Sequence, residues 1–312
     1  MKVVNFTANL TNKLYRFFED YSDAIYSLDS VVRDEKKHNL LEGIIQSRGN
    51  YYIALENEEI EGIIGFKHLN FEAQILGIPC AGIGLLYAKG GYEKEMTTKN
   101  LLLKTFGEWA NKNTIQFVST KVESDDISSV HALEDDGFRM IESATIFRYD
   151  FKRLPLNLGQ VQKNTIRFAT ATDFNAIENL AYESFKYDRF HKDARFDKKL
   201  ASNLKRKWIE NSCKNGNHVI FVADVDGEVG GFLTCHLPQG SSSWTDLIAV
   251  SDKFRGRSIG VELFYKAQEW FSTRCNVLYA STQISNIPSL NTHLRAGFKL
   301  HSNAFTFHKW LY

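Results

Sequence analysis

The stretch that decides the fold is Asp246-Leu-Ile-Ala-Val-Ser-Asp-Lys-Phe-Arg-Gly-Arg-Ser-Ile-Gly260. The apolar residues after Asp246 predict a buried strand, and the segment from Arg255 to Gly260 predicts a loop that opens onto an amphipathic helix. Backbone N–H groups at the start of such a helix point outward, and the helix dipole adds positive potential there. This arrangement is typical of a phosphate-binding site.

A second motif, Asn286-x-x-Ser289-x-x-x-His293-x-x-x-Gly297-Phe298, follows further along the chain. Together the two motifs resemble the signature of the GNAT superfamily, the GCN5-related N-acyltransferases. The loop alone is a weak signal because surface turns also carry glycines, but the second motif at the right distance makes the pair specific. The resemblance implies an α/β fold with a mixed, mostly antiparallel sheet flanked by helices. It also implies an N-acetyltransferase that uses acetyl-CoA.

The sequence contains the same pattern of predicted structural elements twice. Three landmarks recur in the same order: a hairpin, a helix that carries Glu-Trp, and a segment that ends in Gly-Phe. The pairs are residues 52–62 with 220–230, 102–109 with 263–270, and 126–138 with 286–298. Each copy closes with an aromatic strand, around Phe147 and Phe307. We therefore expect two tandem GNAT-like domains, residues 1–155 and 160–312, separated where Pro155 and Gly159 interrupt the pattern.

Composition excludes several other classes of protein. The chain has 312 residues, 43% hydrophobic and 24% charged, with a net charge of +1, so a dedicated nucleic-acid surface is not expected. The N-terminus lacks the apolar core of a signal peptide, and the longest apolar run, 75–88, contains Pro79 and is too short to span a bilayer. The four cysteines have no metal or disulfide spacing. We expect a cytoplasmic monomer or homodimer without a metal and without a membrane partner.

The resemblance assigns cofactor contacts to two segments and one motif. The strand pairs with the pantetheine amides, the loop and helix start hold the pyrophosphate, and the downstream motif reaches the pantetheine. The implied residues are Leu247, Ile248, Ala249 and Val250 in the strand, Arg255, Gly256, Arg257, Ser258, Ile259 and Gly260 in the loop, and Asn286 and Ser289 in the motif. Ser258 stands where the family has glycine, and its Cβ is expected to require ordinary backbone angles.

Two residues are candidates for proton transfer. His293 occupies the position where the superfamily most often has a tyrosine that protonates the departing thiolate. The alternative is that His293 only faces the cleft and that catalysis is by positioning. An amine arrives protonated at neutral pH and needs a base. Asp246 and His191 are the candidates for that base, and either could equally be structural.

The acceptor is expected to bind at residues 187–196 and 207–212, where aromatic and charged residues alternate; a solvated irregular helix pair is the alternative. Arg189, His191 and Trp208 are the candidate substrate contacts. This region resembles the dTDP-fucosamine acetyltransferase group, which implies an amino sugar linked to a nucleotide as the small-molecule acceptor. A polyamine, an aminoglycoside or a peptide amine remains an alternative. A non-catalytic module that binds or senses acyl-CoA is another.

The N-terminal copy lacks the residues that the resemblance assigns to cofactor binding. The repeat sets Lys94–Lys99 opposite the Arg255–Gly260 loop, with no glycine or arginine. Asp126 replaces Asn286, and its charge is expected to repel phosphates, while Leu133 replaces His293. We expect no acyl-CoA site in residues 1–155 and a catalytic domain in 160–312.

Overall fold

The computed structural model describes residues 1–21, 30–46, 49–155 and 163–311. It divides into two compact units: unit 1 comprises Met1–Ser143 and Asn303–Tyr312, and unit 2 comprises Ala144–Ser302. Within the described ranges, no helix has the length and apolar character that crossing a membrane requires. The Leu154–Gly159 stretch, which we expected to separate the domains, lies largely outside the described residues.

Unit 1 contains a mixed sheet whose strands lie in the order β1-β2-β3-β4-β5-β12. All neighbouring pairs are antiparallel except β4 and β5. Its elements, apart from β12, are β1 Lys2–Asn5, α1 Thr11–Phe17, α2 Ser30–Ile45, β2 Asn50–Glu56, β3 Glu59–His68, α3 Asn70–Leu76, β4 Cys80–Ala88, α4 Tyr92–Lys112, β5 Phe117–Glu123 and α5 Ile127–Asp135, with a short 3-10 turn at Ala8–Leu10.

Unit 2 repeats this arrangement with the strand order β6-β11-β10-β9-β8-β7. Only β10 and β11 run parallel to each other among these neighbours. Its elements, apart from β6, are β7 Thr165–Phe168, α6 Phe174–Ser184, α7 Arg189–Lys192, α8 Lys198–Lys214, β8 His218–Val225, β9 Glu228–His236, β10 Ser242–Val250, α9 Ile259–Phe271, β11 Val277–Gln283 and α10 Ile287–Arg295, with 3-10 turns at Ala171–Asp173 and Asp252–Phe254. The predicted α/β class, with a mixed and mostly antiparallel sheet flanked by helices, is confirmed.

The two hairpins predicted from the repeat are both present. The β2–β3 turn places Asn57 and Glu58 at positive φ, and the β8–β9 turn does the same with Asp226 and Gly227. Two consecutive positive φ values are the mark of a type I′ turn, whose twist matches that of paired strands. The acidic turns therefore have the same geometry in both copies.

The closing strands of the two halves are exchanged, which the repeat did not predict. Strand β6, Arg139–Asp150, follows the first copy in the chain, but Ala144–Asp150 pair with β11 of unit 2. Strand β12, Lys299–Trp310, follows the second copy, but Ala304–Trp310 pair with β5 of unit 1. The strands of each unit are thus completed by a strand from the other half of the sequence.

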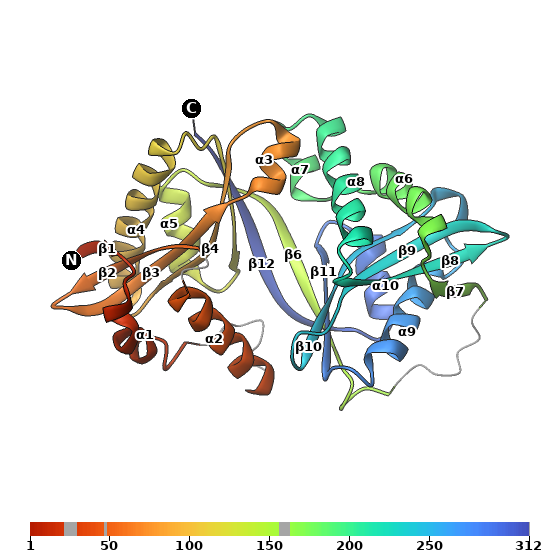
Figure 1. Ribbon diagram of the computed structural model, residues 1–312, viewed down its shortest axis with the longest axis horizontal. Helices are drawn as coiled ribbons and strands as arrows, with labels where there is room; N and C mark the ends of the chain where they lie inside the picture. Colours follow the sequence, from red (N-terminus) through yellow and green to blue (C-terminus); the bar gives the residue numbers. More distant parts are fainter. Residues whose placement is uncertain (22–29, 47–48, 156–162, 312) are drawn as a thin grey trace. The chain divides into compact units, whose positions relative to one another are not determined.

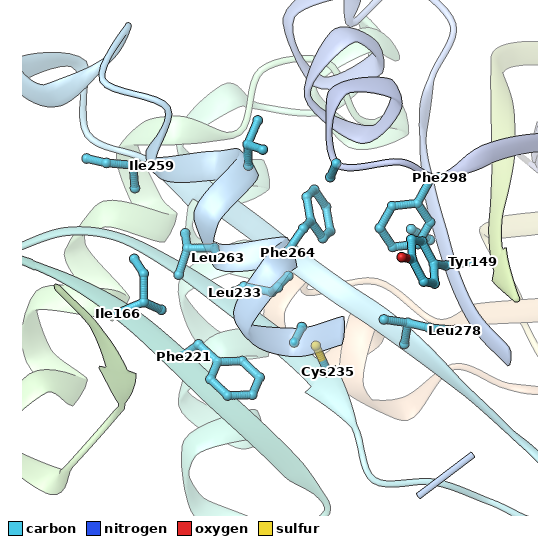
Figure 2. Packing of buried hydrophobic residues seen from close by; sticks show 14 of the residues in the cluster. Tyr149, Ile166, Phe221, Leu233, Cys235, Ile259, Leu263, Phe264, Leu278 and Phe298 are labelled. Carbon is cyan, nitrogen blue, oxygen red and sulfur yellow. The ribbon is translucent and has the colours of Figure 1, made fainter. Parts of the chain in front are cut away.

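Unit 2 has a hydrophobic core on each face of its sheet. Helix α9 contributes Ile259, Leu263 and Phe264 to one core, where Phe298 and the exchanged Tyr149 also lie (Figure 2). Helices α6 and α8 cover the opposite face (Figure 1). Their apolar side chains pack against β8, β9 and β10. The sheet is therefore buried on both faces by helices.

The exchange predicts reciprocal effects of two core substitutions. Phe307 and Phe147 are both 0% exposed, in the cores of unit 1 and unit 2 respectively. Phe307→Ala should cost about 3 to 5 kcal/mol of local stability and speed hydrogen exchange in Phe117–Glu123, because it leaves a cavity in unit 1. Phe147→Ala should do the same in Val277–Gln283. Hydrogen exchange with mass spectrometry checks both, and faster exchange confined to each residue's own half of the sequence would contradict the pairing.

Candidate active site

The two central strands of unit 2 separate after a short common ladder. Strand β10 pairs with β11 from Ser242 to Trp244, opposite Val277 to Tyr279, and the described ladder ends there. Beyond this point β10 continues to pair with β9, while β11 continues to pair with β6. The edge of β10 that faces β11 therefore has backbone groups available to a ligand over Leu247–Val250, where the sequence predicted pantetheine contacts.

A β-bulge lies where the strands part. Three steps along β10, from Thr245 to Ile248, span only two steps along β9. The amide of Leu247 donates to the hydroxyl of Thr234 at 3.0 Å, so this residue of the bulge is held by a side chain. A bulge redirects the side chain next to it. Here that residue is Asp246, which lies two positions past Trp244.

The segment predicted to bind phosphate lies between β10 and α9. Gly256 has φ +80°, a conformation that favours glycine, and helix α9 begins at Ile259. The amides of Val261 and Glu262 donate to the carbonyl of Ser258. No partner is recorded within the described chain for the amides of Ile259 and Gly260, which leaves them as donors for an anion.

Ser258 does not have the ordinary backbone angles that we expected. Its φ is +65° and its ψ is 7°, so it adopts the left-handed conformation that glycine would adopt at lower cost. The hydroxyl of Ser258 accepts a hydrogen bond from Arg295 at 3.3 Å, which adds a third arginine beside the loop. Sequence reasoning missed Arg295 because nothing in its local pattern shows that the end of α10 reaches the loop.

Arg255, Arg257 and Gly260, which we expected to contact the cofactor, also make contacts within the protein. The guanidinium of Arg255 is mostly exposed and pairs with Asp252 at 2.6 Å, while that of Arg257 lies over the ring of Phe254. A Cβ added to Gly260 would lie 3.0 Å from the Thr292 side chain. The glycine therefore allows the close approach of α10 to α9, because a Cβ at this position would crowd the Thr292 methyl group.

Asn286 and Ser289 form the N-terminal cap of α10. The side-chain oxygen of Asn286 accepts from the amide of Ser289 at 3.3 Å, as Asp126 does from Ser129 in unit 1. This cap explains why both copies have Asn or Asp followed three residues later by Ser. Because the side-chain oxygen of Asn286 is used in the cap, the side-chain NH2 group is the part that could donate to a cofactor.

His293 is buried in the core rather than placed for acid catalysis. It is 1% exposed, its ring stacks on Phe147 at 4.7 Å, and its Nδ1 donates to the carbonyl of Ser289 at 2.7 Å. Burial lowers the pKa of His293 to about 4, against the opposing effect of that hydrogen bond. At neutral pH the imidazole is uncharged and its only N–H is already engaged, so this geometry does not supply a proton to a leaving thiolate.

Asp246 lies in a polar cluster that faces α8. The Trp208 side chain hydrogen-bonds to its carboxylate, and its Oδ2 is 3.7 Å from Nε2 of His218. Burial raises the pKa of Asp246, while His236, His218 and Lys205 oppose that shift. The pKa of His218 is lowered, first by burial and then by His236. Trp208, which we predicted as a substrate contact, hydrogen-bonds to Asp246.

His191 and Arg189 lie on α7, in a tightly bonded group. Nδ1 of His191 contacts Asp188 at 2.6 Å and its Nε2 contacts the hydroxyl of Ser202 at 3.2 Å, so both ring nitrogens are occupied. Burial opposes ionisation of Asp188, but Lys205 and His191 lower its pKa to about 2. The Arg189 guanidinium lies over the Phe190 ring. The described structure therefore offers Asp246, rather than His191, as a base, because Oδ2 of Asp246 has no hydrogen-bond partner among the described residues.

The left-handed conformation of Ser258 predicts that glycine will be better tolerated there. Ser258→Gly should raise the free energy of unfolding by up to about 1 kcal/mol, because the cost of a Cβ at positive φ disappears. Ser272→Gly is the matched control at the other end of α9, since Ser272 has an ordinary φ of −54° and should lose stability. Denaturant unfolding measures both variants, and equal losses in the two would contradict the strain.

Comparisons with known proteins agree with this geometry. Residues 174–298 match the acetyltransferase (GNAT) family. The spore coat polysaccharide biosynthesis protein SpsD of Bacillus subtilis is 23% identical over 89% of this chain and 97% of its own. A GCN5-related N-acetyltransferase from Sphaerobacter thermophilus has a TM-score of 0.69 at 14% identity, covering 99% of this chain and 95% of that one.

A tandem GNAT protein from the clavulanic acid biosynthesis pathway shares the fold over nearly the whole length of both chains. Its TM-score is 0.63 at 12% identity, and the match covers 99% of this chain and 98% of that one. The matched family segment runs from α6 to the end of α10, and so includes β10, the loop and Asp246. Residues 174–298 therefore match the GNAT family of acetyltransferases, and the chain is an acyltransferase.

Proposed function

We propose that this chain transfers an acetyl group from acetyl-CoA to the amine of a nucleotide-linked amino sugar, at a single site in residues 160–312. The observation that carries the proposal is the end of the β10–β11 ladder at Trp244 and Tyr279. It leaves a strand edge for the pantetheine amides directly between the phosphate loop and Asp246. Each part of the cofactor then has a matching feature on one continuous segment of chain.

The pyrophosphate binds at the start of α9. The amides of Ile259 and Gly260 donate to it, the helix dipole favours its charge, and Arg255, Arg257 and Arg295 surround the loop. The strained Ser258 holds the loop in the shape that glycine would give elsewhere. The pantetheine arm runs along Leu247–Val250, as an added strand would, and ends beside the bulge.

Asp246 acts as the base for the acceptor amine. The Asp246 carboxylate takes one proton from the ammonium group, and the resulting neutral amine attacks the thioester carbonyl carbon. The carbon–sulfur bond then breaks, and the second proton lost from nitrogen goes to the departing thiolate. Burial raises the pKa of this carboxyl group toward neutral pH, which is the direction that a general base needs. Trp208 fixes one side of the carboxylate, so the other can face the amine.

The thiolate leaves without a dedicated acid on α10. A thiol with a pKa of about 8.5 is a fair leaving group, so positioning of the amine and thioester supplies most of the rate. This assignment favours the positioning alternative for His293 over general acid catalysis. His293 instead supports the site by packing α10 against Phe147 and Phe264.

The preference for an amino-sugar acceptor is supported by two observations. SpsD is named for spore coat polysaccharide biosynthesis, and it matches along nearly its whole length. Helix α7 carries Arg189 and Lys192, which suit an anionic nucleotide better than a cationic polyamine or aminoglycoside. A non-catalytic acyl-CoA module is less well supported, because Asp246 is held at the point where the strands part.

Unit 1 does not bind acyl-CoA in this proposal. Helix α4 begins at Tyr92, six residues before the position that matches Ile259 by the repeat, and only Lys89–Gly91 separate it from β4. Lys94–Lys99 are therefore helical rather than a phosphate loop. Lys99 is 2% exposed and binds Asp126 at 2.9 Å and Ser128 at 2.7 Å, so Asp126 is neutralised rather than repulsive.

Release of free thiol from acetyl-CoA, measured against a panel of amines, tests the activity and the base together. Wild type should respond most strongly to a nucleotide-linked amino sugar. Asp246→Asn should lower kcat by about 10²- to 10⁴-fold, because the amide cannot accept the proton. His293→Phe should keep most of the turnover, since an aromatic ring replaces a neutral one. Tight acetyl-CoA binding without thiol release from any amine would instead favour the sensing module.

Calorimetry with acetyl-CoA tests the number of sites. One molecule should bind per chain, and Arg255→Ala should weaken it because a charge beside the phosphates is lost. Lys94→Ala is the matched control, because Lys94 pairs with Glu61 at 2.7 Å on the helix that replaces the loop in unit 1. Two equivalent sites, or equal losses in both variants, would rule out an inactive first half.

A further inference from the structure

Three side chains with metal-binding atoms converge beside the proposed base. His218 lies at the start of β8, His236 at the end of β9 and Asp246 on β10, and one ligand atom from each lies within 4.8 Å of the others. The two histidines face each other in the β8–β9 register, with ring centroids 4.3 Å apart. The β8–β9 pairing therefore sets the positions of the two histidines, and the bulge in β10 sets the position of Asp246.

The atoms of this group lack hydrogen-bond partners although they are buried. Both ring nitrogens of His218 and Oδ2 of Asp246 have no partner among the described residues. A buried polar atom without a partner costs about 1 to 3 kcal/mol, so native proteins rarely leave several together. The orphaned atoms here are two imidazole nitrogens and a carboxylate oxygen, and His236 is exposed, which gives an ion access from solvent.

We infer that His218, His236 and Asp246 form a binding site for a divalent transition-metal ion such as Zn²⁺, and that the bound ion inhibits acyl transfer. Two imidazoles and one carboxylate are a usual protein ligand set for this class of ion. Zn²⁺ binds such atoms at about 2.0 to 2.2 Å, which sets them roughly 3.4 Å apart in a tetrahedron. Small rotations of the side chains bring the three atoms together, and the exposed His236 moves most easily.

Inhibition follows from the shared carboxylate, and this part of the inference rests on the proposed function. A metal ion on Oδ2 of Asp246 occupies the lone pair that would take the proton from the amine. The charge of Lys205, which is 6% exposed and acts on the same carboxylate, opposes a second cation. The ion is therefore expected to bind reversibly rather than as a permanent structural part.

Zinc titration of the full chain, stripped of metal by chelator, tests the site without reference to activity. Wild type should bind one Zn²⁺, and His218→Ala and His236→Ala should each bind at least about tenfold more weakly. His68→Ala is the matched control, because His68 ends β3 in unit 1 as His236 ends β9, but packs against Trp109 instead of a second histidine. Its zinc affinity should equal that of wild type.

The inhibition is read from thiol release with and without zinc. Zinc should slow the wild type and the His68→Ala variant, and should slow His236→Ala much less relative to its own zinc-free rate. Absence of zinc binding, or binding that both histidine variants retain, would overturn the site. Binding without inhibition would overturn the regulatory role. A wild type that releases no thiol without zinc would count against the proposed function alone, because the binding titration would still report on the site.

Discussion

The parting of β10 from β11 is the constraint on which the rest of unit 2 depends. Two parallel strands that stay paired leave no backbone groups for a ligand, whereas here the ladder ends at Trp244 and Tyr279. The separation is stable because each strand has a second partner: β9 holds β10 and the exchanged β6 holds β11. The loop, the bulge and Asp246 are all placed by this geometry, and without it they would be ordinary features of a buried sheet.

The two halves share several local elements but differ in the segment between the central strand and the helix that follows it. Both have the hairpin with a type I′ turn, the long helix and the Asx cap of the short helix. In unit 1 the extra turns of α4 take the place of the loop, and the buried Lys99 supplies the positive charge internally. Only Lys89–Gly91 connect β4 to α4, so the segment of unit 1 that matches the loop of unit 2 is helical.

Much of the fold could be predicted from local patterns. Strand alternation, the turn dipeptides and the helix-start loop indicated the elements and their order, because these signals depend on neighbours in sequence. The exchange of β6 and β12 could not be predicted, since either strand has the same apolar pattern in either sheet. The candidate site was predicted in part. The strand and loop segments lie where we expected, but His293 was expected at the cleft and instead stacks within the core.

By itself the sequence indicated the GNAT resemblance, which residues 174–298 match, and predicted the duplication and the position of the loop, because these rest on residue types at fixed spacing. Only the tertiary structure decided the left-handed Ser258, the contact of Arg295 with the loop and the convergence of His218, His236 and Asp246. The physical reason is that backbone conformation at one residue, and contacts between strands, depend on packing from distant parts of the chain. The spacing of residues along the chain does not contain information about such contacts. Here they bring side chains from several elements together beside β10.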